Sequence, residues 1–183
     1  MVIVQEKLDG SCTSVALVNN EILALGRAGY LAQTSQHEMH QLFGYWVRSN
    51  EDRFRTVLQE GELLVGEWLA QAHGTRYYLP HEPWVAFDLM VDDQRIVYGE
   101  FLERIAPGEF IAPAIMGLGT GVNGYVAVDR IKLLTGPGLT GGHGNIDQLE
   151  GAVWRVERHG KVDFLAKWVR PDKVDGFYLP HVS

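Results

Sequence analysis

The sequence contains a single cysteine, Cys12, which excludes disulfides within the chain and cysteine-rich zinc sites. It is also short of basic residues, since 16 lysines and arginines stand against 23 aspartates and glutamates and the net charge is -7. Binding to nucleic acid is dominated by neutralisation of phosphates, so this charge argues against a surface that grips nucleic acid over its whole area. Any contact with nucleic acid has to be local.

Long apolar runs are missing too. No stretch approaches the ~20 apolar residues of a membrane span, and residues 1–4 lack the basic start and sustained apolar run of a secretory signal peptide. We therefore expect a cytoplasmic protein with no membrane partner. The 183 residues, 46% of them hydrophobic, are enough to bury a substantial core in one domain, with the glycine-rich segment 136–144 as a surface loop.

Alternation and turn residues predict a chain rich in strands. Residues 2–6 alternate as a strand, and residues 14–18 and 21–25 predict a β-hairpin across Asn19-Asn20, because asparagine tolerates the positive φ of such turns. The segment 7–11 would be the loop that leads into the hairpin. Four later segments have the composition of strands, the last two joined by a turn at His159-Gly160: residues 63–68, 84–90, 151–156 and 162–168.

Helices are predicted between these strands. Ser35 followed by Glu38 is typical of a capping box, and the residues after it keep a 3.6-residue apolar face: Met39, Leu42, Phe43, Trp46 and Val47. The cap pattern repeats at Ser49 before a second helix that Gly61 would stop, and residues 99–105 favour a short third helix. The predicted fold class is α+β, with antiparallel sheets flanked by a few helices.

The segment Lys-Leu-Asp-Gly at residues 7–10 places a lysine beside a tight turn. A match to Lys-x-Asp-Gly is expected by chance on the order of once in a few thousand starts, so alone it is a modest indication. Its weight comes from five short segments that follow in order: GRAG at 26–29, GEW at 66–68, FD at 87–88, EGAV at 150–153 and AKW at 166–168.

This ordered series resembles the covalent nucleotidyltransferase superfamily of ATP-dependent ligases and capping enzymes, over residues 7–167. The residues of these motifs are most similar to those of the RNA ligase branch, because Cys12 stands where DNA ligases and capping enzymes usually carry an arginine. The resemblance implies an ATP-grasp-like ligase catalytic domain of the nucleotidyltransferase fold. It also implies an ATP-dependent RNA ligase that joins a 3′-hydroxyl to a 5′-phosphate through a lysyl-AMP intermediate, with RNA ends, including nicked duplexes, as its partners.

The resemblance makes Lys7 the nucleophile that attacks the α-phosphate of ATP. An ordinary lysine, with a pKa of ~10.4, is protonated at neutral pH and needs partial burial or a neighbouring cation before it can attack. Lys167 is the matching position for that cation and would also contact the α-phosphate, where positive charge stabilises the transition state. Glu150 is placed on the side of a divalent metal, Mg²⁺ or Mn²⁺, which neutralises the triphosphate.

The remaining matched positions are assigned to the nucleotide. By resemblance, Glu67 and Arg27 hold the ribose hydroxyls or the incoming phosphate, and Phe87 stacks on adenine. Asp9, in the turn with Gly10, orients the ribose or the metal. The backbone around Glu6 reads the adenine edge. His73, just after the GEW motif, is a candidate phosphate or substrate contact.

Structural alternatives exist for each residue. Lys7 would be a solvated loop lysine if its motif stood alone, and Phe87, which alternates with Val85 and Leu89, could belong to the core. Arg27 could only form an ion pair with Glu21 or Glu67, and Glu150 could cap a turn. The seven histidines are scattered and indicate no metal site.

Two departures from the family limit the functional prediction. The family usually carries Lys-x-Lys where this chain has Lys167 with Val169, and a strand's period of two puts Arg170, a further candidate phosphate contact, on the opposite face. The chain also has only six residues before Lys7 and sixteen after Lys167, which predicts a bare catalytic domain, with a partner chain as a source of the missing accessory domain. The alternatives are a DNA-end or cap-type nucleotidyltransferase and a non-catalytic nucleotide or nucleic-acid binding module.

Overall fold

A computed structural model describes residues 1–119 and 142–179 of the chain. These residues group into two compact units. The first comprises Met1–Gly10, Gln71–Pro83 and the described part of Pro113–Ser183, and the second comprises Ser11–Ala70 and Trp84–Ala112. Most of the predicted loop 136–144 lies outside the described residues, and the prediction of one nucleotidyltransferase domain stays a prediction.

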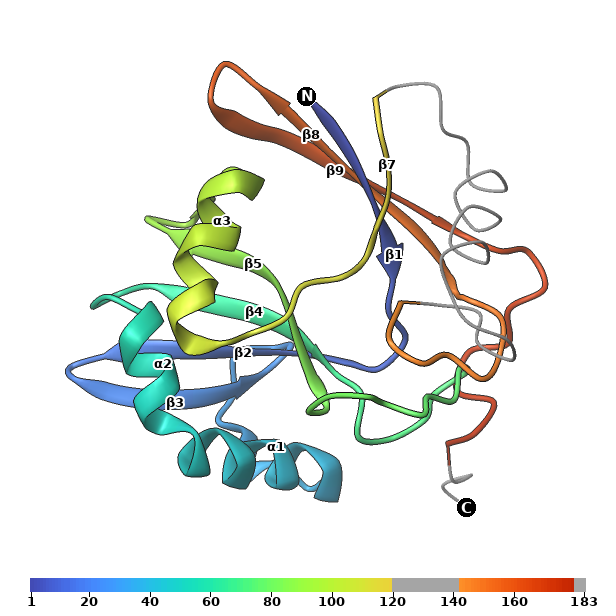
Figure 1. The fold of residues 1–183 in the computed structure, drawn as a ribbon. Helices are drawn as coiled ribbons and strands as arrows, with labels where there is room; N and C mark the ends of the chain where they lie inside the picture. Colours follow the sequence, from blue (N-terminus) through green and yellow to red (C-terminus); the bar gives the residue numbers. More distant parts are fainter. Residues whose placement is uncertain (120–141, 180–183) are drawn as a thin grey trace. The chain divides into compact units, whose positions relative to one another are not determined.

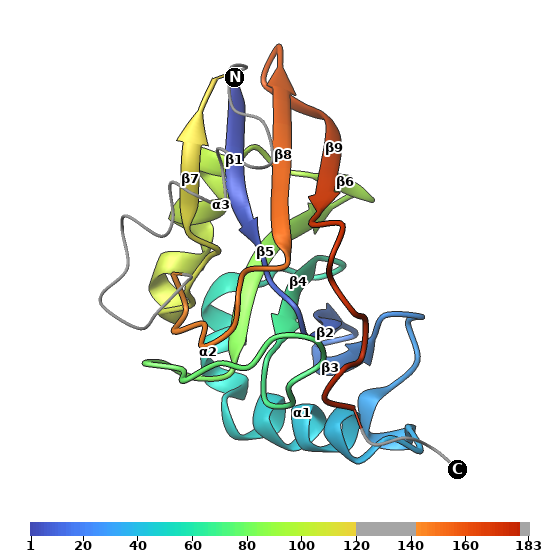
Figure 2. The same cartoon turned by 90° about the vertical axis from the view of Figure 1, so that its right-hand side faces the viewer.

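The first unit is built on a four-stranded antiparallel sheet in the order β7-β1-β8-β9, which Figure 2 shows side by side. Its strands are β1 (Val2–Lys7), β7 (Ile115–Leu118), β8 (Gly151–Arg158) and β9 (Lys161–Val169). The predicted turn at His159 and Gly160 joins β8 to β9, and both residues have positive φ, 51° and 73°. Three strands predicted from alternation and turn residues are therefore confirmed here.

One face of this sheet packs into an apolar core. Val4 of β1 and Ala152 of β8 are buried against Met116 and Leu149, with three further residues packed around them: Ala114, Trp154 and Trp168. Because side chains alternate along a strand, Lys7 lies on the opposite face from Val4. The core thus fixes the strand whose last residue is the predicted nucleophile.

The second unit contains a five-stranded antiparallel sheet in the order β3-β2-β4-β5-β6, with its helices beside it (Figure 1). The strands are β2 (Ser11–Val18), β3 (Glu21–Gly26), β4 (Leu63–Trp68), β5 (Trp84–Val91) and β6 (Gln94–Arg95). The helices are η1 (Ala32–Thr34), α1 (Glu38–Ser49), α2 (Glu51–Val57), α3 (Tyr98–Ile105) and η2 (Ala106–Gly108). The α+β prediction is confirmed.

Aromatic side chains fill the core of the second unit. Phe43 of α1 and Phe54 of α2 reach the sheet at Trp84, with ring centroids 6.2 and 5.5 Å from it. Trp84 is fully buried, and its indole N–H donates to the Thr13 hydroxyl at 2.9 Å. A buried indole needs such a partner, so the apolar stripe and one polar contact together fix the helices on the sheet.

Some local predictions were wrong at the ends of elements. Helix α1 begins at Glu38 without any side-chain cap, because the Ser35 hydroxyl instead accepts the His37 N–H at 3.1 Å. Helix α2 also lacks a side-chain cap and ends at Val57, before Gly61. The segment predicted as a loop from residue 7 is shorter, since Lys7 ends β1 and β2 starts at Ser11. None of the described helices is long and apolar enough to cross a membrane.

Candidate active site

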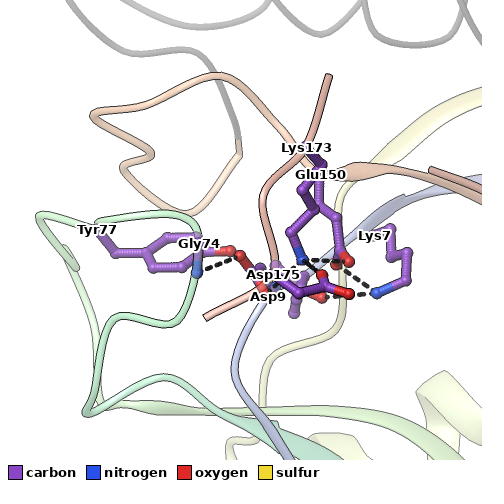
Figure 3. Close-up of polar contacts among 8 residues, drawn as sticks. Lys7, Asp9, Gly74, Tyr77, Glu150, Lys173 and Asp175 are labelled. Atoms are coloured by element: carbon purple, nitrogen blue, oxygen red, sulfur yellow. Dashed lines mark hydrogen bonds and ion pairs between the residues drawn. The ribbon is translucent and has the colours of Figure 1, made fainter. Parts of the chain in front are cut away.

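Lys7 ends β1, where its backbone pairs with Gly151 of β8. Its ammonium contacts the carboxylate of Glu150, the residue just before β8, and lies 3.4 Å from the Leu8 carbonyl oxygen (Figure 3). The Lys7 side chain is 22% exposed, whereas that of Glu150 is 6% exposed. The sheet register therefore brings a partly accessible amine onto a buried carboxylate from 143 residues away in the sequence.

A second lysine, Lys173, completes the cluster. Its amine donates to Glu150 Oε1 at 2.5 Å, to Asp9 Oδ1 at 2.9 Å and to Asp175 Oδ1 at 3.0 Å. Lys173, Glu150 and Asp9 are all nearly buried, while Asp175 is exposed. Figure 3 shows Glu150 between the two lysines. The motifs did not indicate Lys173, which follows the last of them by several residues.

The loop 71–83 holds Asp9 in place. The Gly74 N–H donates to Asp9 Oδ2 at 2.9 Å, and the Asp9 N–H donates to the Tyr77 hydroxyl at 2.9 Å. A Cβ on Gly74 would lie 2.7 Å from the Val174 carbonyl oxygen and 3.0 Å from the Asp9 carboxylate. Only glycine allows this loop to approach the carboxylate so closely. Asp9 is thus positioned from both sides.

The surroundings of the cluster shift the pKa values of Lys173 and His73 in opposite directions. Burial by itself would lower the pKa of Lys173, but hydrogen bonds to Asp9, Glu150 and Asp175 outweigh burial and raise that pKa well above its ordinary value. Burial lowers the pKa of His73, against the opposing influence of the Asp9 and Glu150 carboxylates. The site at neutral pH therefore holds a permanent cation at Lys173 beside a histidine that resists protonation.

Lys167 lies on the same face of the sheet as Lys7. Val153 of β8 pairs with Lys167, and Gly151, two residues earlier, pairs with both Lys7 and Val169. Directly opposed residues and residues two apart point to one face of a sheet. Lys167 is exposed, and its charge contributes to lowering the pKa of Asp175, an effect led by the hydrogen bond from Lys173.

Arg170 lies just beyond the end of β9. The backbone N–H of Arg170 donates to the Glu150 carbonyl oxygen at 3.0 Å. The guanidinium of Arg170 pairs with the Asp172 carboxylate at 2.8 Å. The prediction that Arg170 is on the opposite face of a strand does not apply, because β9 ends at Val169. Contact of Arg170 or His73 with a phosphate stays a prediction.

Glu6 is fully buried and serves the fold directly. Its carboxylate accepts the N–H groups of Ala114 and Gly142, each at 3.0 Å, and lies 2.8 Å from His143 Nε2, although that N–H is not aligned with it. His143 Nδ1 in turn contacts His81 Nε2 at 2.7 Å. The Glu6 N–H already donates to the Ala114 carbonyl oxygen, so reading of adenine by this backbone stays a prediction.

Three other predicted nucleotide contacts belong to the second unit. Arg27 is exposed immediately after β3, Glu67 lies in β4 opposite Cys12 and Val85, and Phe87 is a partly exposed residue of β5. Phe87 therefore does not belong to the fully buried core, which was its structural alternative. Gly10 ends the first stretch of the first unit. The meeting of these residues with the lysine cluster around one nucleotide stays a prediction.

Two carboxylates of the cluster are of the type that binds a divalent metal ion. Among residues 1–119 and 142–179, no group of three or more histidine, cysteine and acidic side chains could hold a metal ion. Asp9 and Glu150 nevertheless supply two hard oxygen ligands that converge on one cation, the Lys173 ammonium. Mg²⁺ typically uses one or two carboxylates together with waters and substrate phosphates, and Asp9 and Glu150 are two such carboxylates.

The RNA ligase family model matches residues 1–169. The chain belongs to the RNA ligase family. This is the branch that the KLDG segment and its five companion motifs predicted. No curated protein matches the sequence.

Solved structures show the same fold at low sequence identity. An archaeal ATP-dependent RNA ligase is similar over 92% of this chain and 42% of its own, with 17% identity and a TM-score of 0.53. A Naegleria gruberi RNA ligase variant, in a structure with ATP and Mn, is similar over 92% of this chain and 49% of its own, with 17% identity and a TM-score of 0.63. A putative ATP-dependent DNA ligase from Aquifex aeolicus is similar over 92% of this chain and 43% of its own, with 19% identity and a TM-score of 0.52.

This chain therefore spans less than half the length of these three structures. Their likeness shows the ligase nucleotidyltransferase fold, which confirms the predicted fold class.

Proposed function

We propose that this chain is the adenylating part of an ATP-dependent RNA ligase, which joins RNA 3′-hydroxyl and 5′-phosphate ends through a lysyl-AMP intermediate. The main support is that the motif lysine, Lys7, contacts Glu150 beside a second buried lysine. In a member of the RNA ligase family, such a cluster has the charges that adenylation needs. The proposed substrates are RNA ends, including nicked duplexes.

In the first step, the Lys7 amine attacks the α-phosphorus of ATP. A nitrogen–phosphorus bond forms, the bond to the bridging oxygen breaks, and pyrophosphate leaves with that electron pair. Lys7 is paired with Glu150, and its amine can attack only through a nitrogen lone pair that carries no proton. Glu150 pairs with the amine, and loss of that pairing would favour the neutral form of Lys7, whose proton passes to solvent water.

Lysine charges would then stabilise the reacting phosphates. Lys173 carries a permanent positive charge next to Glu150, and Lys167 presents its charge on the same sheet face as Lys7. Fixed cations aimed at the developing negative charge lower the barrier of such a step. In the second step an RNA 5′-phosphate oxygen attacks the adenylate and frees Lys7. In the third step the 3′-hydroxyl attacks the activated phosphate and AMP leaves.

ATP and a divalent metal, Mg²⁺ or Mn²⁺, are the proposed cofactors. When bound, the metal would neutralise phosphate oxygens, and Glu150 and Asp9 are the residues that would hold it. Arg27, Glu67 and Phe87 keep their proposed roles at the ribose, phosphate and adenine. A partner chain that supplies an accessory domain is also part of the proposal.

Intact-mass spectrometry tests the first step. Incubation with ATP and Mg²⁺ is expected to add ~329 Da, the mass of one adenylyl group, to the parent and nothing to a Lys7→Ala variant. A parallel reaction with GTP separates this activity from a capping enzyme, and RNA and DNA ends offered to the adenylated protein separate the two ligase classes. A folded parent that binds ATP but gains no adduct would refute the proposal in favour of a non-catalytic binding module.

A further inference from the structure

Glu150 and Asp9 are two nearly buried carboxylates that share a single ammonium, that of Lys173. Their oxygens lie 2.5 and 2.9 Å from its nitrogen. Two carboxylates that converge in this way repel each other and carry a desolvation cost unless a cation lies between them. The position that Lys173 fills is therefore the one that a metal ion bound by these two residues would also need.

We propose that Lys173 is a resident cation that keeps divalent metal out of the Asp9–Glu150 pair until a nucleotide enters the site. The inference rests on the proposed function in one respect, since it takes ATP as the molecule that displaces the lysine. The triphosphate offers the ammonium a new set of anionic oxygens, and the carboxylates are then released for the metal. Metal and nucleotide would bind together rather than in sequence.

The contacts of Lys173 oppose its departure without a replacement cation. Its ammonium donates to Asp9, Glu150 and Asp175 together, so its departure alone would take a cation away from two nearly buried carboxylates. Its third partner, Asp175, is exposed and lies on the same segment after β9. Its stem is packed against Gly74, where a Cβ would lie 3.0 Å from Lys173 Cε.

Binding of Mn²⁺, followed by the electron paramagnetic resonance of the free ion and without any nucleotide, tests this inference. The parent is expected to bind Mn²⁺ weakly, and Lys173→Gln is expected to bind it at least ~10-fold more tightly, equivalent to ~1.4 kcal/mol. Lys161→Gln is the matched control, because it removes the same charge from an exposed position at the start of β9. Lys173→Arg retains the charge and should behave as the parent.

The added affinity should depend on the carboxylates. Lys173→Gln combined with Glu150→Gln is expected to lose it. Equal Mn²⁺ affinity in Lys173→Gln and Lys161→Gln, with both folded by circular dichroism, would overturn the inference. So would stoichiometric binding of Mn²⁺ by the parent without nucleotide, a result that requires no variant to fold.

The outcome is separable from that of the proposed function. One outcome is an adenylyl adduct on the parent together with no gain in Mn²⁺ affinity in Lys173→Gln. This outcome would refute the role of Lys173 as a resident cation and would retain the ligase proposal. Tight Mn²⁺ binding by Lys173→Gln, with no adduct on the parent, would retain the resident cation and refute the adenylation.

Discussion

Gly151 of β8 lies directly opposite Lys7 of β1, and residue 151 itself has no room for a side chain. A Cβ on Gly151 would come within 1.9 Å of the Trp168 carbonyl oxygen on β9. The obstacle is backbone, which cannot rotate away as a side chain can. Close approach of β9 at this point also sets the position of Val169 beside the lysine cluster.

Gly151→Ala is therefore expected to lower the melting temperature, since overpacking of this kind costs ~1–3 kcal/mol or more. It should also reduce formation of the adenylyl adduct, because β8 and the adjoining Glu150 would shift. Gly99→Ala is the matched control: Gly99 lies in α3 with nothing within 4 Å of its Cβ position, and alanine favours a helix. Equal melting temperatures for Gly151→Ala and the parent would contradict the prediction.

The motifs were sufficient to predict the family and the nucleophile because each is short, local and in a fixed order. The strands were found for a related reason: alternation and turn residues such as His159-Gly160 act within a few residues. The predicted cap of α1 was wrong because the Ser35 hydroxyl accepts a hydrogen bond from the His37 N–H instead. Only the three-dimensional arrangement decides which N–H this hydroxyl accepts. Local patterns therefore predicted existence and type of elements better than their ends.

Lys173 could not be predicted from the sequence for a physical reason. It reaches the site through the turn after β9 and meets Asp9, which is 164 residues away along the chain. No residue spacing records such a contact. Gly74 shows the same limit, since its need for glycine comes from Val174 and Asp9 rather than from a turn of its own.

Glu6 is expected to matter for stability. Glu6→Ala would leave the N–H groups of Ala114 and Gly142 without their acceptor and His143 without its carboxylate. A buried N–H group left without its acceptor typically costs ~1–3 kcal/mol, so the variant should melt well below the parent.

Two variants provide the comparison for Glu6. Glu6→Gln keeps the size and one acceptor oxygen and should lose less stability than Glu6→Ala. Glu103→Ala, at an exposed position of α3, should melt with the parent. A Glu6→Ala protein as stable as Glu103→Ala would show that the carboxylate network does not stabilise the fold.

The stability of the protein should fall as the pH falls below neutral. Burial lowers the pKa of His73 and of His81 in the folded protein below the ordinary value of 6.5. The unfolded chain therefore binds protons first, and the stabilisation is fully present above pH 6.5 and is lost as the pH falls toward the folded pKa values.

The comparison for the pH effect is between melting temperatures at about pH 7.5 and about pH 5.5. His73→Gln should show a smaller loss than the parent, while His81 maintains part of the effect. His37→Gln, at an exposed position before α1, should show the same loss as the parent. A pH dependence unchanged by His73→Gln would eliminate His73 as a source of the effect.

Lys167 is expected to act on the chemistry and not on the fold. It is exposed and lies on the Lys7 face of the sheet, so Lys167→Ala should melt with the parent. Removal of one preorganised charge from a transition state commonly slows a reaction by ~10²–10³-fold, and the rate of adduct formation should fall by an amount of that order. The time course of the adenylyl adduct by mass spectrometry measures this rate, and Lys167→Arg should restore part of it.

Arg170→Ala decides which basic residue replaces the second lysine of the family pattern. The Arg170 guanidinium is paired with Asp172, whereas Lys173 lies against Glu150, so Arg170→Ala should slow adduct formation less than Lys167→Ala or Lys173→Gln. A larger effect for Arg170→Ala would mean that its pair with Asp172 opens when ATP binds. The two catalytic cations would then be Lys167 and Arg170, and Lys173 would act only on the carboxylates that it binds in the absence of nucleotide.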